Sequence, residues 1–274
     1  MLSLLLMLPA ALTAQTEINL KNAEKLEGYF DFYWDENKGE IYLTVDKLNQ
    51  EFLYVNSLTA GVGSNDIGLD RGQLGGTQVV YFEKRGPKIL LVQPNYDYRA
   101  ETNNELEQKS VREAFASSVL WGFKIEQSDE GEYLINMTDF LMRDAHGVSN
   151  RLRAQGEGSF SIDRSRSALY REGTFNFPEN SEFEAMLTFK GRPTGRYLRS
   201  VAPNGESFTV RQHHSFIKLP DAGYEPRNHD PRGGFFGISY QDYGTPIDES
   251  LVKRFISRHR LEKKNPDASL SEVV

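Results

Sequence analysis

The 274-residue sequence contains no cysteine. Disulfide bonds, thiolate zinc sites, iron–sulfur clusters and cysteine nucleophiles are therefore all excluded. The sequence also lacks three common motifs of enzyme sites: H-E-x-x-H, which binds zinc, the G-x-S-x-G turn of serine hydrolases, and the phosphate-binding loop G-x-x-x-x-G-K-[ST]. No familiar catalytic apparatus is visible in the chain.

An excess of positive charge is missing as well. The formal net charge is −7 and the sequence pI is about 5.4, which argues against non-specific binding to nucleic acid. Hydrophobic residues make up 38% of the chain and aromatic residues 12%, enough to build a core and exclude general disorder. The length predicts one or two domains.

Long apolar runs are confined to the N-terminus. The run Leu2–Leu12 is interrupted only by Ser3 and Pro9, and small residues follow it up to Ala14. It is too short to span a bilayer and resembles the apolar part of a signal peptide over 1–14, although no Lys or Arg precedes it. We therefore expect no membrane span in the mature chain. We expect an exported protein, located in the periplasm, outside the cell or at the outer membrane.

Short apolar runs separated by turn residues dominate the rest of the chain. This rhythm predicts a β-rich α+β fold built on a large antiparallel sheet, sandwich or barrel, with a few short helices. Helical spacing predicts one helix within 102–118 and a shorter one over 138–145, capped by Thr138. The expected strands cover 28–34, 41–45, 52–57, 78–94 (two strands about a turn), 119–127, 132–137, 158–163, 168–177, 182–190 and 207–219.

The segment after residue 219 has a different character. A long loop extends to Thr245, which could cap a helix that starts at Pro246. Leu251, Val252, Phe255 and Ile256 would form its apolar face, and its other face would be basic. We therefore expect a β-rich domain over 15–219 and a long loop with a basic C-terminal helix over 220–264.

The sequence offers weak candidates for metal binding or acid–base chemistry. His213 and His214 are adjacent in an expected strand, so their side chains should point to opposite faces and not share a metal. Pairs of neighbouring carboxylates occur at Asp35/Glu36, Asp129/Glu130 and Asp248/Glu249, two in expected turns and one at the expected helix start. Solvation and the helix dipole account for them. A glycosidase pair set by the fold stays open.

Several long stretches carry a family resemblance. They include "EGYFDFYWDENKGEIYL", "TDFLMRDAHGV", "VRQHHSFIKLPDAGYEPRNHDPRGGFFGISYQDY" and "RHRLEKKNPDASLSE". Over about residues 20–274 the chain resembles the N-terminal region of large bacterial secreted zinc-dependent metalloproteases of the metzincin-like type. There, a domain of unknown function precedes a catalytic domain with an H-E-x-x-H-x-x-G-x-x-H zinc signature.

The resemblance implies that this chain is a fragment without the catalytic domain. Residues 265–274 resemble a truncated linker toward that absent domain, with Val273-Val274 at the point where a strand would begin. The resemblance implies zinc in the absent domain and no cofactor in this chain, because no position here matches the zinc ligands or the catalytic glutamate. The partner it implies is the catalytic domain, in cis in the family.

Three hypotheses follow. The first is a non-catalytic module that scaffolds, chaperones or restrains the protease domain. The second is a stand-alone exported module that binds glycans or peptides, and the third is a hydrolase with dispersed carboxylates. The first predicts that the missing domain contacts Phe235, Phe236, Leu251 and Phe255. The alternative for Phe235 and Phe236, the two phenylalanines of the loop, is that they fold back on their own sheet.

A restraining module could place a side chain on the protease zinc. Asp230, with neighbouring His229, is the weak metal-binding candidate, because glycines at 233 and 234 allow close backbone approach. The alternative is that Asp230 pairs with Arg227 or Arg232, or caps the turn before Pro231.

Overall fold

The computed structural model describes residues 18–261, 263 and 265–269. The signal-like segment 1–14 and the strand start expected at Val273-Val274 lie outside this range and stay predictions. Within the described residues, no helix combines the length and apolar character needed to cross a membrane.

A 13-stranded sheet, antiparallel throughout, forms the body of the protein. Its main path is β1-β2-β3-β9-β8-β6-β5-β4-β14-β13-β10, and two short strands, β11 and β12, pair with β13. The bounds are β1 (Glu24–Leu26), β2 (Phe32–Asp35), β3 (Glu40–Val45), β4 (Glu51–Ala60), β5 (Leu74–Arg85), β6 (Lys88–Gln93), β8 (Ser118–Asp129), β9 (Glu132–Asn136), β10 (Gly158–Ile162), β11 (Ala168–Leu169), β12 (Phe175–Phe177), β13 (Asn180–Pro193) and β14 (Ser207–Lys218).

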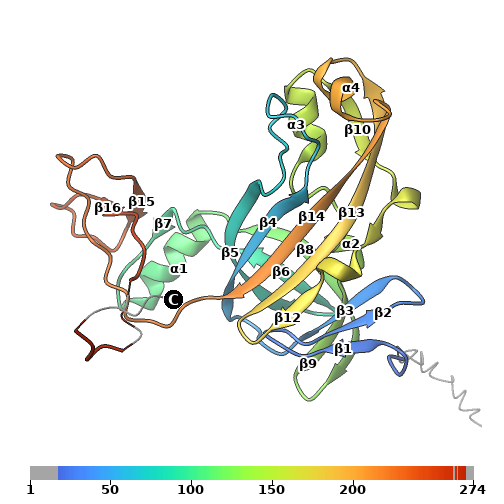
Figure 1. Cartoon of the computed structure of the whole chain (residues 1–274). Coiled ribbons are helices and arrows are strands. Elements are labelled where there is room, and N and C mark those ends of the chain that lie inside the picture. The colour runs from blue at the N-terminus through green and yellow to red at the C-terminus, as the bar shows by residue number, and fades with distance from the viewer. Residues whose placement is uncertain (1–17, 262, 264, 270–274) are drawn as a thin grey trace, which may run out of the picture.

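The two ends of this sheet approach each other. The Tyr29 N–H donates to Phe177 O over 2.8 Å, and the Phe30 N–H donates to Ser181 Oγ over 3.1 Å. The sheet is thus nearly closed into a barrel, and Figure 1 shows its long strands curving around one axis. The expected fold class is confirmed in this respect.

Phenylalanine rings fill the inside of the barrel. Phe30, Phe52, Phe82 and Phe216 are fully buried, and their ring centroids lie 5.0 to 6.2 Å apart. Phe52, Phe82 and Phe216 come from strands with alternating burial, which turn every second side chain inward, and Phe30 lies just before β2. Aromatic pairs of this kind contribute about 0.5–1.5 kcal/mol beyond the area they bury.

Short helices complete the barrel. They are α1 (Glu105–Ala114), α2 (Thr138–Leu141), α3 (Val148–Ala154) and α4 (Tyr197–Val201), with 3-10 turns η1 (Arg164–Arg166) and η2 (Arg171–Gly173). The helices expected within 102–118 and over 138–145 are present, as α1 and α2. The expected cap of α2 is wrong: the Thr138 hydroxyl accepts the Ile41 N–H (3.1 Å), and Met137 occupies the cap position. The strand expected over 168–177 is also wrong, because η2 separates β11 from β12.

A second, three-stranded sheet has the order β16-β15-β7. It consists of β7 (Tyr98–Arg99), β15 (Gly237–Asp242) and β16 (Val252–Ile256), and projects from the barrel beside α1 (Figure 1). We call it the small sheet. β15 runs antiparallel to β16 and parallel to β7.

The expected C-terminal basic helix is wrong, because its residues form β16. The Thr245 hydroxyl does not cap a helix but donates to Asp242 Oδ2 over 3.1 Å in a turn. Val252–Ile256 pair with Gln241–Gly237, and the Ile256 N–H also donates to Arg227 O in the preceding loop (2.8 Å). A short helix is marginal in water, whereas the strand satisfies its backbone on two sides and suits β-branched residues.

Candidate functional site

The residues expected to contact a partner domain gather at the small sheet. Phe235 and Phe236 directly precede β15 and are 66% and 92% exposed. Leu251 directly precedes β16 and Phe255 lies within it, and both are half-buried. The structure therefore does not fold Phe235 and Phe236 back on their own sheet. It brings the loop and β16 together, since the Ser257 N–H donates to Phe236 O over 2.9 Å.

One face of the small sheet carries a row of apolar side chains. Ile238 lies directly opposite Phe255 and is 61% exposed. Tyr240, two residues further along β15, has its ring stacked on Phe255, with centroids 6.0 Å apart. The Arg99 guanidinium lies 4.0 Å from the Tyr240 ring centroid, and the Tyr240 hydroxyl donates to Glu101 Oε1 over 2.6 Å. The row thus becomes more buried toward the barrel.

Burial and the neighbouring Glu101 carboxylate raise the pKa of Tyr240 to about 12. The hydroxyl therefore stays protonated and acts as a hydrogen-bond donor. At the other end of the row, Phe235, Phe236 and Ile238 remain open to solvent. We call these three residues the apolar patch.

The weak metal candidates do not converge on a common point. The Asp230 carboxylate pairs with Arg232, with Nη2–Oδ2 at 2.6 Å and Nε–Oδ1 at 2.9 Å, and also accepts the Arg232 N–H. The Arg232 side chain lowers the pKa of Asp230. His229 is held through its backbone, whose N–H donates to Arg254 O over 3.0 Å. The arrangement matches the structural alternative, in which Asp230 pairs with Arg232.

The described residues contain no group of three or more His, Asp or Glu side chains arranged to hold a metal ion. The neighbouring carboxylates Asp35/Glu36 and Asp129/Glu130 lie in or beside turns, as expected. Asp248/Glu249 lie in a turn before β16, because the helix expected there is absent.

His213 and His214 occupy opposite faces of β14, as expected. Outside the barrel, His213 Nε2 lies 2.7 Å from Glu182 Oε2, and Nδ1 lies 3.2 Å from Glu184 Oε2. Burial alone would lower the pKa of His213, but hydrogen bonds to the two carboxylates raise it to about 9. The imidazolium pairs with both glutamates, so none of the three is a free base at neutral pH.

Further bonds hold this cluster in place. The Ser215 hydroxyl donates to Glu182 Oε2 (2.5 Å), and the Thr59 hydroxyl donates to Glu184 Oε1 (2.7 Å). Burial raises the pKa of both glutamates, but the bonds with His213 and with the neighbouring hydroxyls together outweigh this and lower it. The cluster links β13 to β14 by charge and to β4 by the Thr59 hydrogen bond, in addition to the backbone pairing of these strands.

Inside the barrel, His214 belongs to a separate polar network. Its Nδ1 lies 2.9 Å from the Tyr54 hydroxyl, which accepts a bond from Arg143 Nη2, and its Nε2 lies 3.1 Å from Leu141 O. The Gln212 amide nitrogen also lies 2.9 Å from Nε2, so polar partners hold the ring at both nitrogens. Burial lowers the pKa of His214 to about 3. The side chain is thus a structural connector between β14 and α2.

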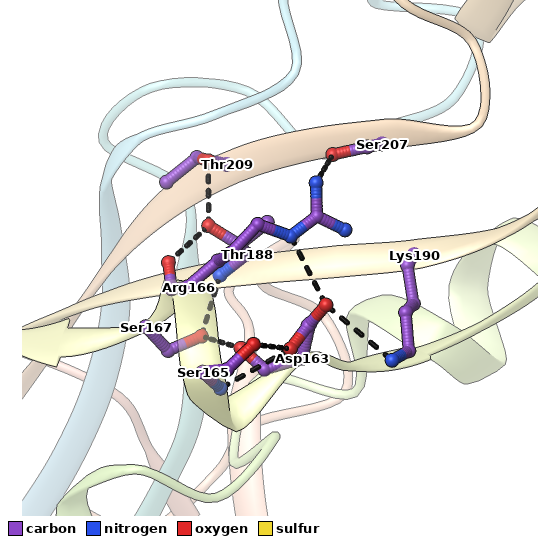
Figure 2. A network of polar contacts seen from close by, with 8 residues as sticks. All are labelled: Asp163, Ser165, Arg166, Ser167, Thr188, Lys190, Ser207 and Thr209. Atoms are coloured by element: carbon purple, nitrogen blue, oxygen red, sulfur yellow. Dashed lines mark hydrogen bonds and ion pairs between the residues drawn. The ribbon is translucent and has the colours of Figure 1, made fainter.

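A third polar cluster surrounds Asp163, between β10 and η1 (Figure 2). Its Oδ1 accepts bonds from the Ser165 N–H (3.1 Å) and hydroxyl (2.6 Å), and its Oδ2 pairs with Arg166 Nε (3.0 Å) and Lys190 Nζ (3.4 Å). These groups, led by Ser165, hold the pKa of Asp163 well below its usual range. The carboxylate is occupied on both oxygens, as expected for a structural anchor.

A pocket of about 490 Å³ lies between the barrel wall and α1. The Tyr96 hydroxyl, at its rim, donates to Glu51 Oε1, and Arg99 Nε donates to Tyr96 O over 2.9 Å. Its aromatic lining is supplied by Tyr81, Tyr96, Tyr98 and Phe115.

Sequence reasoning did not find this pocket, the Glu182–His213–Glu184 cluster or the contribution of Ile238. The only local signal for the cluster is that two glutamates two positions apart in a strand share one face of it. Which histidine they meet depends on the β13–β14 register, in which Glu184 lies opposite His213.

Two family models match the chain, and both describe a domain of unknown function. The model DUF5118 matches residues 17–61 and DUF5117 matches residues 72–264. No curated protein matches, and no solved structure matches. The first region ends after β4 and the second begins just before β5, so the boundary falls in the glycine-rich loop between these paired strands. Because the second match covers more than half of the sequence, the chain belongs to the family of the domain of unknown function DUF5117.

Proposed function

We propose that this chain is a non-catalytic module of an exported, zinc-dependent metalloprotease, and that it scaffolds or restrains the catalytic domain. The observation that carries the proposal is the apolar patch. Three large apolar side chains within four residues are 61–92% exposed at the outer end of the small sheet. Solvent-exposed clusters of this kind commonly mark protein interaction sites.

The position of the patch supports a protein partner. Glycines at 233, 234 and 237 flank Phe235 and Phe236, whose side chains are largely exposed. The small sheet behind them is held by β15–β16 pairing and by the Tyr240–Arg99 contact. A rigid base with exposed aromatic rings has the composition of an interface hot spot.

The resemblance of the chain to the N-terminal region of secreted metalloproteases supplies the identity of the proposed partner. Under this proposal zinc and the catalytic groups belong to the partner domain. The chain would be exported with it and would meet it outside the cytoplasm.

The test is a binding measurement with a separately produced catalytic domain from a protease whose N-terminal region resembles this chain. The double variant Phe235→Ser/Phe236→Ser should weaken binding by at least about tenfold, as truncation of hot-spot residues does. The matched control is Phe175→Ser/Phe177→Ser on β12, since these rings are 48% and 47% exposed on another part of the molecule.

The control should bind like the unchanged chain. If both double variants bind equally well, or if the unchanged chain does not bind the catalytic domain, the proposal is wrong.

A further inference from the structure

The strand β5 has an unpaired edge. Residues from Tyr81 to Arg85 pair with β6 on one side, and residues from Leu74 to Tyr81 pair with β4 on the other. Between Leu74 and Val80, no described strand pairs with the side of β5 that faces away from β4. The barrel wall is therefore open along about half of this strand.

The direction of the backbone groups along this edge follows from one hydrogen bond. The Asn49 N–H donates to Phe82 O over 2.8 Å, and Asn49 lies on the β4 side of β5. Successive residues of a strand direct their N–H and C=O groups to opposite sides. Phe82 directs its backbone groups toward β4, and by alternation Val79 and Thr77 direct theirs to the open edge.

Nothing in the sequence protects this edge from pairing. Residues from Leu74 to Val80 read "LGGTQVV", without charge and without proline. Natural proteins usually block an exposed edge with lysine, proline, an inward-pointing charge or a covering segment. An uncharged edge with β-branched residues is suited to receive another strand.

A hollow runs beside the unpaired edge. It measures about 370 Å³, and its lining includes Thr77 and Val79 of β5 together with Asn95, Asp97 and Ser118. This hollow shares Pro94, Asn95 and Tyr96 with the 490 Å³ pocket between the barrel and α1. An extended chain placed along β5 would therefore lead directly into the aromatic pocket.

Three charged side chains around that pocket already have partners in the structure. Glu51 accepts the Tyr96 hydroxyl, Glu101 accepts the Tyr240 hydroxyl, and the Arg99 guanidinium lies over the Tyr240 ring. The remaining lining includes the rings of Tyr81 and Phe115. These rings favour a side chain with an apolar body, and the exposed Arg112 guanidinium also lines the pocket.

We propose that the open edge of β5 binds an extended peptide as an additional strand, with an apolar or aromatic side chain of that peptide in the adjoining pocket. Hydrogen bonds from Thr77 and Val79 would supply the backbone recognition, and the pocket would supply side-chain preference. This site is separate from the apolar patch, and the proposal does not depend on the identity of the partner domain.

The test starts from a phage-displayed library of random peptides selected on the immobilised chain. Affinities of the selected peptides are then measured by fluorescence anisotropy. The variant Val79→Pro removes an N–H that faces the open edge and leaves the bonds to β4 in place. We expect binding to weaken by about tenfold or more, whereas Val79→Thr should bind like the unchanged chain.

Circular dichroism and thermal unfolding check that Val79→Pro is folded. Should that variant unfold, the same bonds are tested from the peptide side. Two forms of the selected peptide are made, one N-methylated at the odd-numbered amides and one at the even-numbered amides. One of the two forms should no longer bind the unchanged chain. The proposal is overturned if no peptide is selected, or if neither the proline nor N-methylation weakens binding. It is also overturned if the chain forms a dimer that Val79→Pro dissociates, because a second copy would then occupy the edge.

Discussion

His213 and His214 are neighbours in β14, yet one is held as a cation between two carboxylates and the other is buried as a neutral ring. The alternation of side chains along a strand separates them onto opposite faces of the sheet. Outside, Glu182 and Glu184 stabilise the positive charge of His213. Inside, the aromatic core disfavours any charge on His214.

This difference predicts opposite pH dependences of stability. The pKa of His213 is raised from an ordinary 6.5 to about 9, so its contribution is complete below pH 6.5 and is lost as pH rises through 9. The loss is on the order of 3–4 kcal/mol, since each pKa unit corresponds to about 1.4 kcal/mol. Urea unfolding at several pH values between 6 and 10 should show this decline, and His213→Gln should reduce it.

The pKa of His214 is lowered to about 3, so its contribution to stability has the opposite pH dependence. Its contribution is present above pH 6.5 and is lost as pH falls toward 3, because the unfolded chain then binds a proton that the folded chain resists. A variant His214→Gln should be less stable at neutral pH but should lose less stability on acidification. Equal slopes for this variant and the unchanged chain below pH 6 would contradict the assignment.

The Tyr54 hydroxyl is predicted to contribute more to the free energy of unfolding than an ordinary tyrosine hydroxyl. The change Tyr54→Phe removes the hydrogen-bond partner of His214 Nδ1 and of Arg143 Nη2 inside the barrel. Leaving such groups unsatisfied costs about 1–3 kcal/mol, to be measured by urea unfolding. The control Tyr33→Phe removes a hydroxyl for which the described residues supply no hydrogen bond, and it should change the unfolding free energy little.

The Asp163 cluster should stabilise the β10–β13 end of the barrel. The variant Asp163→Asn keeps the size of the side chain but weakens the bonds from Ser165, Arg166 and Lys190, so the melting temperature should fall. The control Asp139→Asn breaks only the exposed ion pair with Arg164 and should leave the melting temperature almost unchanged. A similar effect of both changes would rule out the anchoring role.

The two family regions are predicted to fold as one unit. The strand β4 belongs to the first region and pairs with β5 and β14 of the second. A chain of residues 18–61 should therefore be unfolded alone, because β4 then lacks both neighbours and its core rings are exposed. Mixed with residues 62–269, it should regain β structure by circular dichroism, and a folded state of 18–61 alone would refute this prediction.

The sequence by itself determined the features that depend on neighbouring residues. Short apolar runs between turn residues located most strands, and the spacing of Leu106 and Val111 located α1. The adjacent positions of His213 and His214 in a strand placed them on opposite faces. These are local properties, because the side-chain direction in a strand or helix repeats over two or about four residues.

Only the tertiary structure decided what depends on pairing between distant segments. Residues 252–256 have an apolar spacing that also fits a helix, but hydrogen bonds to β15 and to Arg227 make them a strand. The partners of His213, the closure of the barrel at Tyr29 and the open edge of β5 all depend on strand order and register. Those are settled by the free energy of the whole sheet and core, to which residues over a hundred positions apart contribute together.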